Sequence, residues 1–306
     1  MDASIRPGED PAVELRAVHK WYGRTEALRG IDLRIETGEV VAILGPNGAG
    51  KTTAISLMLG LRRASEGDVR SFGLPPSDRR ARSRRGVMLQ ETGVPAVLTV
   101  RELVDLFRTY YPAPLETDAA LGLAGLGDQG DTRVGHLSGG QRQRLYFALA
   151  VCGDPEALFL DEPTVAMDVA SRRAFLATIG VFATEGRTIV LTTHDLDEAD
   201  ALAERVIVID RGRIVADDSP TRLKARVPGK RVRFHTDAPL SAGWSAGLPV
   251  SGLSVDGGDV RFLSNEPEDV LAALFARDVR PRYLEVAGAD LEEAFLALTS
   301  EQEVLR

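Results

Sequence analysis

A glycine-rich stretch between residues 45 and 53 constrains this chain more than any other part of its sequence. It reads Gly45-Pro46-Asn47-Gly48-Ala49-Gly50-Lys51-Thr52-Thr53 and has the spacing Gly-x-x-x-x-Gly-Lys-Thr. The apolar run Glu39–Leu44 precedes it, as a buried parallel strand would, and a second apolar run, Ala54–Leu59, predicts a helix after it. Strand, glycine loop and helix form the setting in which this spacing binds phosphate. The sequence therefore predicts a site for a nucleoside triphosphate.

The residue types of this loop suit the parts of such a ligand. Gly45, Gly48 and Gly50 allow a tight turn whose backbone N–H groups point inward at anionic oxygens. The positive end of the following helix adds to that attraction. We expect Lys51 to contact the β- and γ-phosphates and Thr52 to offer its hydroxyl to Mg²⁺.

Composition and charge limit the other possibilities. A chain of 306 residues can hold one large domain and a smaller one, and we expect residues 1–11, which are mostly polar, to form a flexible tail. The net charge of −8 argues against general affinity for nucleic acid or anionic lipid. Cys152 is the only cysteine, which excludes an internal disulfide and favours a reducing compartment. No apolar run approaches the roughly 20 residues that span a bilayer, so a membrane role would need a partner chain.

Polar side chains follow two further buried strands. The run Ala157–Leu160 ends in Asp161 and Glu162, and the run Thr188–Thr193 ends at His194. An Asp in this place would hold Mg²⁺, directly or through water, and the next carboxylate could polarise a water for attack on the γ-phosphate. The carboxyl ends of parallel strands form the edge at which ligands bind, so His194 is a third candidate there.

A second potential phosphate site lies at the start of a predicted helix, Arg142–Val151. The preceding residues are Leu137-Ser138-Gly139-Gly140-Gln141, which we call the signature segment. Ser138 is suited to cap the helix, and the two glycines allow close approach of a ligand to the backbone. Two phosphate sites in one small ATPase need an explanation.

An antiparallel sheet is expected before the glycine loop, because Val13–Val18 and Ala27–Ile35 alternate apolar and polar residues. Between them, Tyr22 is the candidate for stacking on adenine, in preference to Trp21; ordinary packing of both rings is the alternative. The arginine-rich stretch Asp78–Arg85 is interpreted as a solvated helix face rather than a docking surface.

The pattern changes after residue 226. Short alternating strands and two helices follow, and the region contains no glycine loop and no acid pair. We expect residues 227–306 to form a small α+β accessory domain. Its elements are predicted as the strands Arg231–Thr236, Val260–Leu263 and Tyr283–Val286 and the helices Pro267–Arg277 and Asp290–Thr299.

The motifs taken together resemble an ATP-binding cassette (ABC) nucleotide-binding domain over residues 12–226. The resemblance rests on the order and spacing of Walker A (45–53), Gln90 after its strand, the signature segment, Walker B (Asp161-Glu162) and His194. The tail Asp290–Thr299 is similar to the C-terminus of ABC-2-type drug and antibiotic exporters of the daunorubicin-resistance kind. The fold so implied is an α/β P-loop ATPase core with an antiparallel β subdomain, a helical subdomain at about residues 91–152, and the accessory domain.

The resemblance also explains the second phosphate site. In ABC ATPases two domains close head to tail, and each ATP lies between Walker A of one and the signature of the other. The signature segment would therefore contact ATP held by a second copy of the chain, in a symmetric homodimer. The resemblance further implies that Tyr22 stacks on adenine, that Gln90 joins Mg²⁺ to a membrane partner, that Glu162 activates water and that His194 holds the γ-phosphate.

One loop departs from the family pattern. Before Asp168 the family usually has Ser-Gly-Leu or Ser-Ala-Leu, whereas this chain has Val165-Ala166-Met167. Met for Leu is nearly neutral in volume, but Val165 removes a hydroxyl from a loop that crosses the seam between the two domains. Hydrolysis is still expected, and the usual coupling between the two ATP sites is open to question.

The function implied is that of the ATP-binding and ATP-hydrolysing subunit of an ABC exporter. It would power a separate polytopic permease by ATP-driven dimer closure and would lie on the cytoplasmic face of the membrane. The alternatives are an importer ATPase or a soluble ABC ATPase that acts on ribosomes or nucleic acid. The net charge and the single cassette argue against the last, and no nucleic-acid partner is expected. Glu162 and His194 argue against a regulator that binds ATP without hydrolysing it.

Overall fold

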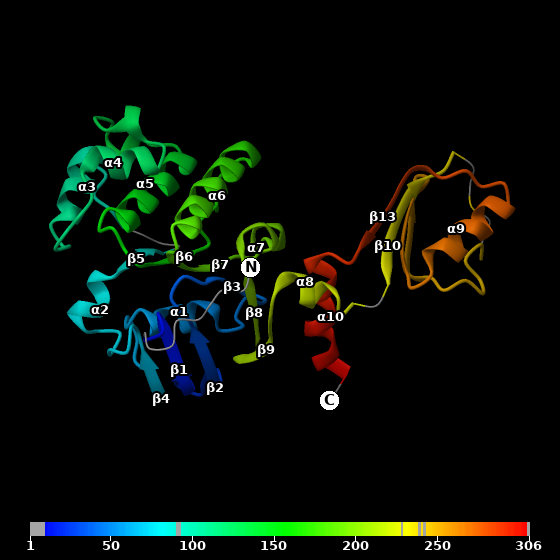
Figure 1. The fold of residues 1–306 in the computed structure, drawn as a ribbon, viewed down its shortest axis with the longest axis horizontal. Helices are drawn as coiled ribbons and strands as arrows, with labels where there is room; N and C mark the ends of the chain where they lie inside the picture. Colours follow the sequence, from blue (N-terminus) through cyan, green and yellow to red (C-terminus); the bar gives the residue numbers. More distant parts are fainter. Residues whose placement is uncertain (1–9, 90–92, 228, 238–239, 241–242, 305–306) are drawn as a thin grey trace. The chain divides into compact units, whose positions relative to one another are not determined.

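The computed structural model describes residues 10–89, 93–227, 229–237, 240 and 243–304. Two compact units make up the chain, and the boundary between them in the sequence falls between Ser219 and Pro220. Figure 1 shows the helices and strands of each. Each unit is described separately below.

A six-stranded sheet forms the centre of the first unit, in the order β5-β6-β7-β3-β8-β9. All neighbours are parallel except β8 and β9, which form an antiparallel hairpin. Every residue of β3, β6 and β7 is buried, which explains why their sequences are continuous apolar runs. The strands are β3 (Val40–Leu44), β5 (Arg85–Met88), β6 (Ala157–Asp161), β7 (Thr188–Thr192), β8 (Arg205–Asp210) and β9 (Arg213–Asp218).

Helices follow the three central strands directly, and the one after β3 is the helix that the sequence predicted after the glycine loop. Helix α1 (Lys51–Met58) follows β3, α6 (Val169–Thr184) follows β6, and α7 (Leu196–Leu202) follows β7. A short helix, α2 (Arg79–Ser83), precedes β5. The carboxyl ends of β3, β6 and β7 therefore lie side by side at one sheet edge, each at the start of a connection to a helix.

A three-stranded antiparallel sheet, ordered β2-β1-β4, is the second layer of this unit. Strands β1 (Val13–Tyr22) and β2 (Thr25–Ile35) confirm the predicted pair. The sequence did not indicate β4 (Glu66–Arg70), because Val69 is its one apolar residue. Buried side chains of β1, β2, α1 and the central strands form a single core, so this sheet and the P-loop region pack as one body.

The third part of the unit is a group of helices (Figure 1). Helix α3 (Val100–Arg108) begins with a capping box in which Thr99 and Glu102 bond each other's backbone N–H groups. Helix α4 (Thr117–Leu123) was not predicted, because Gly122 lies inside it and interrupts the helical pattern. Two short 3₁₀ turns, η1 (Gly127–Gln129) and η2 (Val134–His136), lead to α5 (Gly139–Val151).

The second unit is the expected α+β domain around an antiparallel sheet in the order β11-β12-β10-β13. Its core includes Val232, Phe234, Phe262 and the α9 residue Leu274. Helix α8 contacts α10, so residues 220–224 belong with this unit, although the sequence interpretation had continued the first domain to residue 226. The elements are α8 (Pro220–Lys224), β10 (Lys230–His235), β11 (Ser251–Asp256), β12 (Asp259–Ser264), α9 (Pro267–Ala276), β13 (Arg282–Gly288) and α10 (Leu291–Val304).

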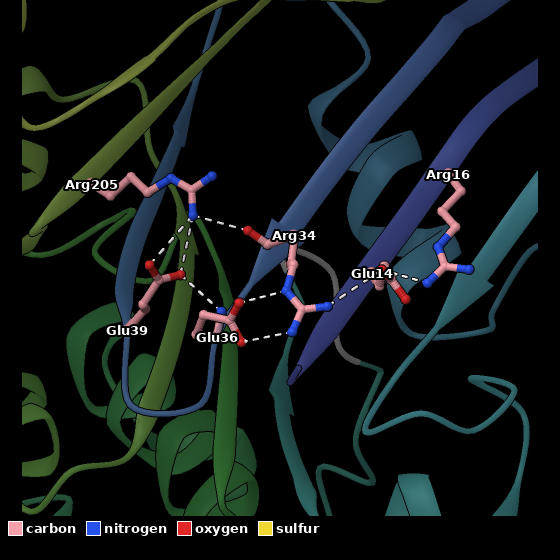
Figure 2. Close-up of polar contacts among 6 residues, drawn as sticks. All are labelled: Glu14, Arg16, Arg34, Glu36, Glu39 and Arg205. Atoms are coloured by element: carbon pink, nitrogen blue, oxygen red, sulfur yellow. Dashed lines mark hydrogen bonds and ion pairs between the residues drawn. The ribbon is translucent and has the colours of Figure 1, made fainter. Parts of the chain in front are cut away.

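Charged side chains join the two sheets of the first unit (Figure 2). Arg205 at the start of β8 donates to the backbone oxygen of Arg34 on β2 (2.9 Å) and lies 3.2 Å from a carboxylate oxygen of Glu39. Arg34 in turn pairs with Glu36 at 2.5 Å and with Glu14 of β1 at 3.5 Å. The Arg205 side chain is 27% exposed, against 50% for Arg34 and 68% for Arg16, so its bonds are less screened than those of the outer members. This guanidinium therefore helps to fix the antiparallel sheet against the P-loop sheet.

We expect Arg205→Ala to destabilise the first unit by about 1–2 kcal/mol, because the backbone oxygen of Arg34 and the carboxylates of Glu39 and Asp217 lose this donor. The measurement is the melting temperature of the full chain. Arg16→Ala is the matched control, since Arg16 pairs with Glu14 at the exposed end of the same network, and it should leave the melting temperature near that of the wild type. Equal losses for the two variants would contradict a bridging role for Arg205.

Candidate active site

The P-loop, residues 45–53, has backbone geometry that requires glycine at two positions. Gly45 has φ 154° and a Cβ there would lie 2.1 Å from the backbone oxygen of Ile209. Gly50 has φ 113° and a Cβ would lie 2.7 Å from the backbone oxygen of Ala27. The loop therefore packs closely between β8 and β2, and the neighbouring backbone leaves no room for a side chain at these two positions.

Lys51 begins α1 and is almost fully buried, with 7% of its surface exposed. Its ammonium donates to the backbone oxygens of Gly45 (2.6 Å) and Pro46 (3.2 Å). Burial lowers the pKa of Lys51, and the charges of Glu162 and Asp161 act in the opposite direction. The structure thus brings the P-loop lysine into the field of both predicted acids. Of the other loop residues, Ala49 is buried, Gly50 and Thr53 are half-buried, and the exposed ones are Pro46, Asn47, Gly48 and Thr52.

Asp161 ends β6 and pairs in register with Thr192, the last residue of β7. The Thr192 hydroxyl donates to the Asp161 carboxylate, which is buried. Burial raises the pKa of Asp161, and the bond from Thr192 opposes that shift. Sequence reasoning missed Thr192. A hydroxyl residue at the end of a buried strand, level with the end of the Asp strand, is the signal that could have found it.

Glu162 and His194 lie together at the same sheet edge. Glu162 has φ 49°, a strained value for a side chain with a Cβ, and its N–H donates to the backbone oxygen of Thr192 at 3.0 Å. Nδ1 of His194 lies 3.5 Å from Oε1 of Glu162. The Glu162 side chain is mostly buried, whereas 66% of the His194 side chain is exposed. A carboxylate with fixed backbone therefore faces an imidazole that is open to a ligand.

The signature segment lies elsewhere, at the start of α5. Ser138 and Gln141 form a capping box: the Ser138 Oγ accepts from the Gln141 N–H (3.2 Å), and the Gln141 Oε1 accepts from the Ser138 N–H (2.9 Å). Both side chains line a pocket of about 750 Å³ that we call the signature pocket. Among the described residues that line it, none belongs to the P-loop. The lining is Gly125, Leu126, Gly127, Asp128, Gln129, Ser138, Gly139, Gly140, Gln141, Arg144, Ala166, Asp168 and Ser171.

The loop from Val165 to Asp168 contributes Ala166 and Asp168 to the lining of this pocket. Asp168 caps α6, and its carboxylate accepts from the N–H (2.9 Å) and the hydroxyl (2.8 Å) of Ser171. These bonds lower the pKa of Asp168. Ala166 has φ 64°, and a Cβ on Gly139 would lie 3.4 Å from it, so the loop is in close contact with the signature segment. The Val165 side chain is 37% exposed, while Met167 is buried.

Two further predicted residues, Tyr22 and Gln90, are not among the residues described above at the sheet edge or the signature pocket. Tyr22 ends β1 with 43% of its surface exposed, and the Lys20 ammonium lies 5.2 Å from its ring centre. Trp21 instead stacks on His19, with ring centres 5.2 Å apart. Gln90 lies outside the described residues. Arg144 and the residues of η1, which line the signature pocket, were not singled out from the sequence.

The predicted residues thus form two separate groups. Lys51, Asp161, Glu162 and His194 gather at the carboxyl ends of β3, β6 and β7. The signature segment and Asp168 gather at the signature pocket. The first group has the charges of a phosphate-binding and water-activating site, and the second presents capped backbone and hydroxyl groups.

Comparison with known proteins identifies the family of the chain. Residues 28–165 match the family described as ABC transporter. A daunorubicin resistance ATP-binding protein from Streptomyces coeruleorubidus is 41% identical over 228 residues, covering 72% of this chain and 71% of that protein. A Nod factor export ATP-binding protein from Burkholderia orbicola is 32% identical over 298 residues, covering 95% of this chain and 97% of that protein.

Solved structures agree on the fold. A dimeric ATP-binding cassette in a post-hydrolysis state with ADP and Pi is similar at a TM-score of 0.62 and 27% identity, covering 68% of this chain and 98% of that one. The cbiO1 protein of Clostridium perfringens, part of an ABC transporter complex, is similar at 0.64 and 28%, covering 71% and 92%. The P-loop, the buried acids and these relatives together place the chain in the family of ATP-binding subunits of ABC exporters, and its activity is the hydrolysis of ATP.

Proposed function

We propose that this chain drives export by binding Mg²⁺–ATP between two copies of itself, which act on a separate permease. The observation that carries the proposal is the separation of its two groups of site residues. The P-loop group holds the charges that a triphosphate needs, and the signature pocket shares no described lining residue with it. Each ATP would then need the P-loop group of one copy and the signature pocket of another.

In the P-loop group, each residue has a role that follows from its position. The Lys51 ammonium, now on the backbone oxygens of Gly45 and Pro46, would turn to the β- and γ-phosphates. The backbone N–H groups of residues 48–53 would bind the phosphate oxygens at the start of α1. The exposed ring of Tyr22 supports stacking on adenine, since Trp21 is already engaged with His19.

The residues at the sheet edge fit a Mg²⁺ ion. Asp161 is a buried carboxylate, and burial raises its pKa. A cation bound beside it would stabilise the charged form of this carboxylate. Asp161 and the Thr52 hydroxyl would hold the ion, with Gln90 as the third proposed ligand. When bound, the ion would supply positive charge to the β- and γ-phosphates.

Glu162 is the proposed base. Its carboxylate, mostly buried, would accept a proton from the water that attacks the γ-phosphate. The exposed imidazole of His194, 3.5 Å from that carboxylate, would contact the γ-phosphate and orient the same water. The strained backbone of Glu162, held by Thr192, supports a fixed direction of approach.

The signature segment would complete the site from the other copy. The Ser138 hydroxyl and the N–H groups of Gly139 and Gly140 would contact the γ-phosphate at the start of α5, with Gln141 and Asp168 beside them. A dimeric cassette is among the similar solved structures, which supports this arrangement.

A permease partner is expected because export needs a path through the membrane. In the described part of the chain, no helix has the length and apolar character to cross a bilayer. Two relatives are named for daunorubicin resistance and Nod factor export, which favours export over import and over a role on ribosomes or nucleic acid. The proposed location is the cytoplasmic face of the membrane, against the permease.

Co-purification tests the transport role. The tagged chain, taken from detergent-solubilised membranes, should bring down a polytopic membrane protein in stoichiometric amount. Ribosomal proteins or nucleic acid in its place would overturn the proposed function and leave the ATPase assignment intact.

Glu162→Gln should keep ATP binding and reduce turnover by roughly 100-fold or more, because an amide cannot accept the proton. The variant should also form a stable dimer with ATP, seen by size-exclusion chromatography. Glu156→Gln is the control: Glu156 precedes the same strand, at its opposite end, and pairs with Arg84 at 2.6 Å. Wild-type turnover in Glu162→Gln would remove Glu162 from its proposed role.

Asp161→Asn should raise the melting temperature of the chain without nucleotide, in EDTA at pH 7, and abolish stabilisation by Mg²⁺–ATP. The folded-state pKa of Asp161 lies above its unfolded value of about 3.9, so its contribution to stability is lost as pH rises through that pKa. An amide removes this cost, and a rise of roughly 2–4 °C would correspond to about 1 kcal/mol.

The gain should shrink as pH falls through about 4, because the unfolded-state carboxylate then also takes up a proton and the difference between the two states decreases. A gain that is the same at pH 4 and pH 7 would mean that the buried charge is not its cause.

A further inference from the structure

Glu198 is a carboxylate buried inside the first unit, with 1% of its surface exposed. It lies on α7, and a buried charge of this kind is costly unless it is paired and hydrogen-bonded. Its Oε1 accepts from the Thr164 hydroxyl, and its Oε2 accepts from the Thr193 hydroxyl at 2.8 Å. Nε of Arg172 lies 3.6 Å from Oε1 as an ion pair. Three groups thus compensate one carboxylate.

The partners of Glu198 come from three segments that carry site residues. Thr164 lies in the turn that begins at Glu162, and Thr193 directly precedes His194. Arg172 lies in the first turn of α6, which Asp168 caps. One carboxylate therefore joins the segment of the proposed base, the segment of the imidazole and the helix that follows the 165–168 loop.

Glu198 and its three partners, Thr164, Thr193 and Arg172, form what we call the junction. A second set of bonds surrounds it. The Arg172 guanidinium also pairs with Asp195, whose N–H donates to the Thr193 hydroxyl at 2.9 Å. Asp195 caps α7 by accepting from the N–H of Asp197 at 3.1 Å. On the other side, the turn is closed by the N–H of Met167, which donates to the backbone oxygen of Thr164 at 3.1 Å. A displacement of any of the three segments must break bonds made by Glu198 or Arg172.

We propose that Glu198 is a positioning residue for ATP hydrolysis: it holds the turn that carries Glu162 in register with the segment that carries His194. It further links both to α6, so that a movement of the 165–168 loop changes their geometry. The inference rests on the roles proposed above for Glu162 and His194. A misplacement of about 1 Å between reacting groups is enough to slow a reaction on the order of 100-fold.

The P-loop lies outside this junction. None of the described contacts of Glu198 reaches residues 45–53, and Lys51 is held by P-loop backbone. Loss of the Glu198 carboxylate should therefore affect turnover and leave ATP binding intact. A carboxylate that served stability alone would show the opposite pattern, a fall in melting temperature with no selective effect on kcat.

The test compares Glu198→Ala and Glu198→Gln in the full chain by kcat, KM for ATP, ATP affinity and melting temperature. Glu198→Ala should lower kcat by about 10-fold to 100-fold, with KM and affinity within about 3-fold of the wild type. Glu198→Gln keeps the shape and one acceptor oxygen, so it should recover part of kcat. Unchanged kcat in Glu198→Ala, or equal changes in kcat and affinity, would overturn the inference.

A matched pair of variants, one at the start of β7 and one directly after its end, provides a test if Glu198→Ala fails to fold. Thr193→Val removes the hydroxyl that bonds Glu198, whereas Thr188→Val removes a buried hydroxyl at the other end of β7, where it accepts from the N–H of Gly38 at 2.9 Å. Thr193→Val should lower kcat at unchanged affinity, and Thr188→Val should leave kcat near wild type. Equal kcat for the two would overturn the inference.

The two hypotheses fail separately. Normal turnover in Glu162→Gln would remove the proposed base and, with it, the basis of this inference. An inactive Glu162→Gln together with a fully active Thr193→Val would overturn the role of Glu198 alone.

Discussion

The burial of one ammonium in the field of two carboxylates is the constraint on which the site depends. Lys51, Asp161 and Glu162 reach the same sheet edge because β3 and β6 are parallel and both flank β7. Burial lowers the pKa of Lys51 and raises that of Asp161, and the attraction between the two charges opposes both shifts without reversing them. The hydroxyl of Thr192 adds a neutral donor. This balance keeps a strongly charged site inside an apolar core.

The proposed dimer follows from the separation of the two groups of site residues. The P-loop group provides a cation, two acids and an imidazole, while the capped backbone of the signature segment lies in another pocket. Both features are rigid locally: Gly45 and Gly50 are confined by backbone, and Ser138 and Gln141 cap each other. Rigid halves that bind one ligand from two sides favour association over internal rearrangement, which is why the proposed unit of function contains two copies.

Sequence reasoning gave correct positions where these depend on strand ends and on local backbone chemistry. Walker A, the acids after β6, His194 and the Ser138 cap could all be placed from short patterns. It failed where partners are distant in sequence: Thr192 bonds Asp161 through strand register, and Glu198 bonds Thr164 across 34 residues. It also missed β4 and α4, whose patterns are too short or interrupted by Gly122. Which residues become neighbours across a sheet cannot be predicted from a short stretch of sequence alone.

The 165–168 loop contacts one group of site residues and adjoins the other within one chain. Thr164, the residue before the loop, bonds Glu198, which also bonds Thr193 next to His194. Ala166, within the loop, lies against Gly139 of the signature segment. Asp168 then caps α6, the helix that carries Arg172 back to Glu198 and Asp195. In the proposed dimer, a ligand that moved the signature segment would also push on this loop, and a shift of the loop would alter the bond of Thr164 to Glu198. Val165 offers an exposed apolar side chain instead of a hydroxyl, so contact with another copy through this residue would rest on packing and not on a hydrogen bond.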